Sequence, residues 1–175
     1  MRLKRTAAVL GAALTTLVAL TGCGGSSWGE DAGLPAAGDM AAIEKLVGRH
    51  TMCSDLRTGT GDNGVLSAES QDPAWAIEQR GVCGNDARDT LTLLSVSDME
   101  KFQQANKKAA AAGHDTRFLV GQDFAVVATD PAAAKALMAT DVLLFTCAKD
   151  FKVPDGYRSE KLLVDGCALT DYLPG

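Results

Sequence analysis

Four of the five cysteines in this 175-residue chain constrain its fold more than any other feature. An even number of cysteines in an exported chain indicates a disulfide framework, and four cysteines allow three pairings. We favour Cys53–Cys83 and Cys147–Cys167, because each pair closes a local loop and leaves the rest of the domain independent. Each bridge would stabilise the fold by about 3 kcal/mol.

The beginning of the chain indicates export. Arg2, Lys4 and Arg5 form a short positive segment, and residues 7–20 form an apolar run. This run is shorter than the ~20 residues that span a bilayer, and it lies close to the N-terminus. It therefore predicts a secretory signal and not a permanent membrane anchor.

The apolar run ends in Leu20-Thr21-Gly22-Cys23, which resembles the lipobox of bacterial lipoproteins. The resemblance implies that residues 1–22 are a signal peptide and that the Cys23 thiol carries a diacylglyceryl group, whose fatty acyl chains include palmitate. It also implies that the mature protein is held at the extracytoplasmic face of the cell membrane. Two acyl chains make such an attachment stable. The alternative is a secreted protein in which a cysteine stands at position 23 by chance.

The segment after Cys23 has the composition of a linker. Residues 23–38 are rich in Gly, Ser, Pro and Ala, which is typical of a flexible tether. We therefore expect a lipidated Cys23 with a tether over residues 23–38, followed by a single extracytoplasmic domain over residues 39–175.

The charge of the chain bears on its partners. Of its 17 basic and 22 acidic residues, Arg2, Lys4 and Arg5 precede Cys23 and no acidic residue does, so the remainder carries a net charge of −8. A domain with this net negative charge does not have the excess of basic residues that binding to nucleic acid phosphates requires. Attachment to a membrane should therefore come from acyl chains and not from a basic patch.

Hydrophobic spacing and turn residues predict an alternation of helices and strands. The better-defined elements are a helix over 40–47 capped by Asp39, a strand over 90–96, a helix from Ser97-Asp98 to Ala112, a hairpin of 117–120 with 124–129, and a helix from Asp130-Pro131 to Met138. Three further segments are a helical turn or strand over 72–81, a strand or helix continuation over 142–145, and a late strand over 161–164.

The order β-α-β-β-α-β resembles a ferredoxin-like α+β sandwich, in which helices pack on one face of a small antiparallel sheet. Disulfides would cross-link and stabilise this fold. The pattern of a cysteine before a strand–helix–hairpin–helix unit also resembles small two-disulfide domains of Gram-positive lipoproteins. That second resemblance implies no activity and no site residues.

No catalytic constellation is evident, and we predict no catalytic residue, no cofactor and no metal site. His50 and His114 lie where surface or capping residues are expected. Motifs of serine hydrolases and zinc proteases are missing, and no C-x-x-C supports a redox site. His50, Met52 and Cys53 would supply ligands for copper, but a disulfide half beside a surface histidine explains the same residues.

The function predicted from these features is a non-enzymatic accessory module that binds another envelope protein. It requires an exposed apolar or aromatic patch, for which Trp75 and Tyr157 are candidates. One alternative is a small-ligand or metal-binding lipoprotein, which needs a pocket of several hundred Å3. A less favoured alternative is a surface hydrolase or redox enzyme, which needs His50 or His114 beside a carboxylate, or a reducible disulfide.

Overall fold

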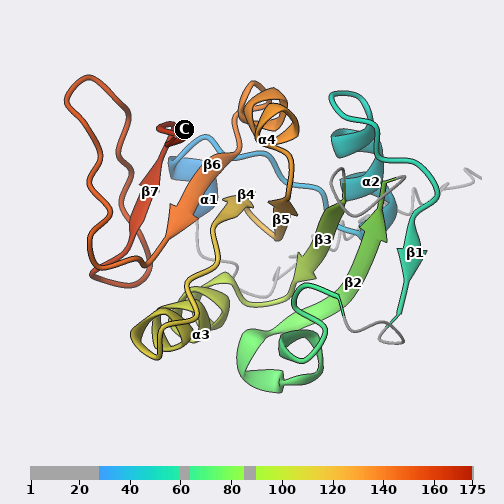
Figure 1. Ribbon diagram of the computed structural model, residues 1–175, viewed down its shortest axis with the longest axis horizontal. Coiled ribbons are helices and arrows are strands. Elements are labelled where there is room, and N and C mark those ends of the chain that lie inside the picture. Colours follow the sequence, from blue (N-terminus) through green and yellow to red (C-terminus); the bar gives the residue numbers. More distant parts are fainter. Residues whose placement is uncertain (1–27, 60–63, 85–89, 175) are drawn as a thin grey trace, which may run out of the picture.

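The computed structural model describes residues 28–59, 64–84 and 90–174. In these residues one antiparallel sheet, with strand order β1-β2-β3-β5-β4-β6-β7, forms the centre of an α+β fold (Figure 1). The strands are β1 (Arg57–Thr58), β2 (Ile77–Cys83), β3 (Leu91–Val96), β4 (Phe118–Val120), β5 (Phe124–Ala128), β6 (Leu143–Thr146) and β7 (Ala168–Thr170). The helices are α1 (Trp28–Asp31), α2 (Met40–Gly48), α3 (Met99–Ala111) and α4 (Pro131–Met138), with 3-10 turns η1 (Glu69–Gln71) and η2 (Pro73–Trp75).

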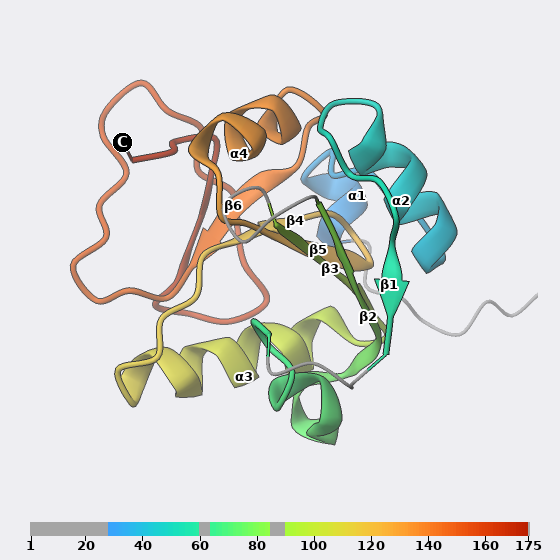
Figure 2. The same ribbon diagram turned by 45° about the vertical axis from the view of Figure 1, so that its right-hand side comes forward.

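Helices cover both faces of the sheet, so the expectation that they pack on one face is wrong. In Figure 2, α3 lies below the sheet and α2 and α4 lie above it. Successive side chains of a strand point to opposite faces. Phe118 of β4 accordingly packs on Phe102 of α3, with ring centroids 4.9 Å apart, whereas Leu119 belongs to the core cluster that α2 and α4 cover.

The position of β6 explains why the ferredoxin-like arrangement is not adopted. In that arrangement the last strand of the motif pairs with the first, and both helices cover one face. Here β2 occupies that edge of β3, and β6 pairs with β4. The crossovers β3-α3-β4 and β5-α4-β6 therefore both lead toward the β7 edge of the sheet, although β3 and β5 are antiparallel. Crossovers between parallel strands are right-handed. Two crossovers that lead to the same edge but start from strands of opposite direction therefore place α3 and α4 on opposite faces.

Most predicted elements are confirmed, because their signals are local. Asp39, Asp98 and Asp130 each accept a hydrogen bond from a backbone N–H in the first turn of their helix, as N-caps do. Residues 72–81 contain both alternatives, since η2 is followed by β2.

The late strand predicted over residues 161–164 is wrong. The Cys147–Cys167 disulfide holds the end of β6 beside the start of β7, so Thr146 pairs with Ala168. Residues 168–170 consequently form the strand, while 161–164 are irregular.

Both favoured disulfides are present. Cys53–Cys83 joins the chain after α2 to the end of β2, and Cys147–Cys167 closes the loop between β6 and β7. Each bridge therefore ties an irregular segment to the sheet.

Residues 28–38 are packed on the domain and do not form the expected tether. Leu34 is 3% exposed and lies in the core cluster on the α3 face. The side-chain amide of Gln122, in the β4–β5 turn, donates a hydrogen bond to the Leu34 carbonyl, and the Asp123 carboxylate accepts one from the backbone N–H of Gly38. A Gly- and Ala-rich composition suggested flexibility, but burial of Leu34 and these tertiary hydrogen bonds hold the segment in place.

The signal peptide over residues 1–22 and the lipid attachment at Cys23 lie outside the described residues. Within the described part of the chain, no helix is long and apolar enough to cross a bilayer. The expected lipid anchor therefore remains a prediction.

Candidate functional site

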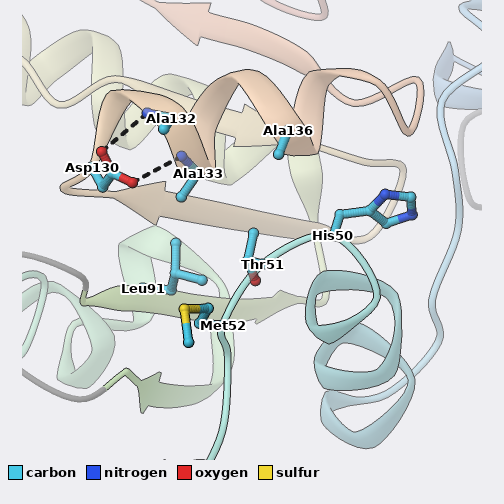
Figure 3. A pocket seen from close by; sticks show the side chains of 8 residues that line it. All are labelled: His50, Thr51, Met52, Leu91, Asp130, Ala132, Ala133 and Ala136. Atoms are coloured by element: carbon cyan, nitrogen blue, oxygen red, sulfur yellow. Dashed lines mark hydrogen bonds between the residues drawn. The ribbon is translucent and has the colours of Figure 1, made fainter.

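An apolar groove with a volume of about 280 Å3 lies between α4 and the chain that follows α2 (Figure 3). We call it the α4 groove. It is lined by His50, Thr51, Met52, Leu91, Asp130, Ala132, Ala133 and Ala136. The groove thus brings together three segments that are far apart in the sequence: the chain after α2, the start of β3 and the first turns of α4.

One wall of the groove is a smooth helix face. Ala134 and Leu137 of α4 are buried against the sheet. Because side chains three and four residues apart share a helix face, the neighbouring face of α4 presents small side chains to the groove: Ala132, Ala133 and Ala136. Alanine carries no atoms beyond Cβ, so this wall is apolar and without protrusions.

The opposite wall is held in position from both sides. The Thr51 hydroxyl donates a hydrogen bond of 2.8 Å to the carbonyl of Val47, which is buried in α2. Two residues further on, Cys53 is bonded to Cys83, which is fully buried in β2. Met52 lies between these two fixed points and is nevertheless 78% exposed.

The polar groups of the groove are largely paired within the protein. Both carboxylate oxygens of Asp130 accept hydrogen bonds from backbone N–H groups of α4, at 3.1 Å from Ala132 and 3.2 Å from Ala133. His50 lies at the other end of the groove, and its imidazole points away from Asp130 (Figure 3). The two side chains therefore do not form an acid–base pair, and the groove is suited to apolar contact.

A second exposed feature is a cluster of three aromatic residues, Phe151, Tyr157 and Tyr172. The ring centroids of Tyr157 and Tyr172 are 4.8 Å apart, and those of Phe151 and Tyr172 are 6.0 Å apart. Tyr157 is 49% exposed, as its candidacy for a surface patch requires. Phe151 and Tyr157 lie in the loop that the Cys147–Cys167 disulfide closes.

The other candidate patch residue, Trp75, is not at the surface. Its side chain is 7% exposed and packs edge-to-face on Phe102, with ring centroids 5.7 Å apart. The Asp72-Pro73 turn directs it into the aromatic core on the α3 face. Trp75 is therefore a core residue, and its prediction as a surface contact is wrong.

The residues considered for metal or acid–base chemistry are not assembled into one site. Cys53 is in a disulfide, so it offers no thiolate to copper beside His50. His114 lies in an exposed turn after α3, where the neighbouring Asp115 accepts a hydrogen bond from the Thr146 hydroxyl. Among the described residues, no group of three or more His, Cys, Asp or Glu side chains could hold a metal ion.

Sequence reasoning did not identify the α4 groove. From the sequence alone, Met52 stands out only as a ligand for copper, and the segment from Asp130-Pro131 to Met138 only as a helix. The spacing of Ala132, Ala133 and Ala136 on one helix face is the signal that could have indicated a smooth surface. What stands opposite that surface depends on tertiary packing.

Comparisons with known proteins identify no relative of this chain. No family model, no curated protein and no solved structure matches it. The geometry of the α4 groove is therefore the basis for the functional proposal.

Proposed function

We propose that this chain is a bacterial lipoprotein whose domain binds an apolar segment of another envelope protein in the α4 groove. Residues 1–22 are removed, Cys23 is acylated, and the non-enzymatic domain is held at the extracytoplasmic face of the cell membrane. The observation that carries the docking function is Met52, which is 78% exposed at the rim of an apolar groove.

The size and chemistry of the groove favour a protein segment over a small ligand. A volume of about 280 Å3 is at the lower end of the range of small-molecule sites, which is about 300–1,000 Å3. The polar groups of Thr51 and Asp130 are used by the protein itself, so few remain to orient a polar ligand. One or two apolar side chains of a partner would fill such a groove.

Burial of Met52 would provide much of the binding energy. Full burial of a methionine side chain is worth about 1.5–3 kcal/mol, and its flexible thioether adapts to irregular surfaces. The Cys53–Cys83 disulfide keeps the adjacent backbone in place, which lowers the entropy lost on binding.

The two disulfides support the extracytoplasmic location, because such bonds persist in oxidising compartments. The net charge of −8 after residue 22 supports attachment through acyl chains rather than through anionic lipids.

Site-specific photocrosslinking in intact cells tests the docking function. A benzophenone side chain is placed at Met52, at Tyr157 in the aromatic cluster, and at Val65, an exposed apolar control. We expect one protein adduct that forms from position 52 and not from position 65. An adduct from position 157 alone would overturn the α4 groove as the binding site. No protein adduct from position 52 would overturn protein docking there and would favour the small-ligand alternative.

A matched pair of alanine variants makes the test specific. Ala133→Glu places a charge in the α4 groove, whereas Ala41→Glu places the same charge on an exposed position of α2. We expect Ala133→Glu to abolish the adduct from position 52 and Ala41→Glu to preserve it. Equal adduct yields in the two variants would contradict docking in the groove, provided that both retain the circular dichroism spectrum of the parent.

A further inference from the structure

The folded N-terminal segment lies beside a partly exposed apolar surface. The Trp28 indole N–H donates a hydrogen bond to the carbonyl of Lys161, and Arg158 donates one to the carbonyl of Ala32. The side chains of Trp28, Leu162 and Leu163 are only partly buried, and Lys161 is exposed. These four are among the seven residues that line a hollow of about 300 Å3, and we call the four the Trp28 surface.

The distance from Cys23 to this surface is short. Only residues 24–27 separate Cys23 from Trp28. At about 3.5 Å per residue, a fully extended chain from Cys23 reaches Trp28 within roughly 17 Å. The folded part of the chain, with a radius of gyration of about 15 Å, is roughly 38 Å across. An acyl group on Cys23 therefore cannot reach a membrane on the far side of the domain.

We propose that the Trp28 surface lies against the lipid headgroups when Cys23 is inserted in the membrane. This inference rests on the proposed lipid anchor. Tryptophan favours the headgroup region, where its ring meets both apolar and polar groups, and Trp28 is the described residue nearest in sequence to Cys23. Leu162 and Leu163 extend the apolar contact beside it.

The short chain between Cys23 and Trp28, and not electrostatic attraction, holds this surface at the membrane. Asp31 and Glu160 line the same hollow as Lys161, and Glu160 pairs with Arg158, so this surface is not a basic patch that would attract anionic lipids. Contact with lipid should therefore persist at high salt, where electrostatic attraction at a surface is screened.

The same geometry turns the α4 groove away from the lipid. Residues 32 and 34 belong to the core cluster on the α3 face, and the backbone N–H of Leu163 donates a hydrogen bond to the Gln103 side chain of α3. The groove is instead on the face that α2 and α4 cover, where Leu91 belongs to the other core cluster. With the Trp28 surface at the membrane, Met52 faces the space in which a partner would approach.

Tryptophan quenching in vesicles tests the orientation. The full-length lipoprotein, purified from membranes, is reconstituted in phosphatidylcholine vesicles that contain a headgroup spin-labelled lipid. Trp75→Phe leaves Trp28 as the one tryptophan, because the chain has two. The matched control combines Trp28→Phe, Trp75→Phe and Met52→Trp. We expect the lipid label to quench Trp28 strongly and the tryptophan introduced at position 52 weakly, at low and high salt alike.

A longer linker tests the argument from reach. A Gly-Ser insertion of about 20 residues after Ser27 adds a root-mean-square length of roughly 25 Å. We expect it to abolish the quenching of Trp28 while the protein still floats with the vesicles. Quenching that survives the insertion would overturn the role of the short linker.

The outcomes separate this inference from the lipid anchor. If the protein floats and carries acyl chains on Cys23 but Trp28 is not quenched, the orientation is wrong and the anchor stands. Equal quenching at the two positions would also overturn the orientation. If Cys23 carries no acyl chains, the lipid anchor and the orientation that rests on it fail together.

Discussion

Leu34→Ala tests whether residues 28–38 belong to the folded domain in solution. Leu34 is 3% exposed, so the variant removes three buried carbons, worth about 2.4 kcal/mol at ~0.8 kcal/mol per CH2 group. The cavity that remains adds to this loss. We expect the free energy of unfolding to fall by about 3 kcal/mol, within the range of about 2–5 kcal/mol for buried leucines.

The assay is urea unfolding of the non-lipidated domain, followed by circular dichroism. For a domain of this size the expected loss lowers the melting temperature by about 6–12 °C. Ala36→Ser is the control, because Ala36 is exposed in the same segment and its replacement should change stability by less than about 0.5 kcal/mol.

If Leu34→Ala changes the free energy of unfolding by less than about 0.5 kcal/mol, as is typical of surface positions, then residues 28–38 are not packed on the domain in solution. The folded domain would then begin after residue 38, and the short reach from Cys23 that places the Trp28 surface at the membrane would no longer apply.

Three further predictions concern the disulfides, a helix cap and Met52. Replacing Cys147 and Cys167 with alanine opens a loop with a sequence separation of 20 and should lower the free energy of unfolding by about 3.3 kcal/mol through loop entropy. The same replacement of Cys53 and Cys83 opens a loop with a separation of 30 and should lower it by about 3.6 kcal/mol. Losses below about 1 kcal/mol in urea unfolding would contradict this. The Lys101 backbone N–H lowers the pKa of the Asp98 carboxyl, so the cap stabilises α3 above the ordinary aspartate pKa and weakens as the pH falls through the lowered value. Asp98→Ala should accordingly cost about 1 kcal/mol at neutral pH and less near pH ~3, and an equal cost at both would contradict a charged cap. Met52→Asp should change stability by less than about 0.5 kcal/mol, because the side chain is 78% exposed; thermal unfolding that shows a large loss would indicate a core role instead.

Local sequence signals were sufficient for most elements of the fold. An aspartate before an apolar stripe identifies the start of α2, α3 and α4, since the cap and the helix lie within a few residues of each other. The disulfide pairing could also be predicted, because each bridge closes a loop between segments that are near in sequence.

The errors concern features that depend on tertiary structure. Whether both helices share a face depends on which sheet edge β6 joins, and no local pattern encodes that choice. Leu34 is flanked by Gly33 and Pro35, so its segment resembles a linker until Gln122 and the α3-face core are brought to it.

The candidate site was even harder to predict from the sequence. Met52 and Ala133 share the α4 groove only because α2 and α4 cover the same face of the sheet. An exposed methionine beside a cysteine has no distinctive pattern, whereas the opposing alanines are typical of many helices. The groove therefore emerges from packing alone.

The most direct test of the lipoprotein proposal is the intact mass of the mature chain extracted from bacterial membranes. We expect a chain that begins at Cys23 and carries a thioether-linked diacylglyceryl group, together with loss of that group in Cys23→Ala. A chain that retains residues 1–22, or an unmodified Cys23, would contradict the lipid anchor and the orientation derived from it.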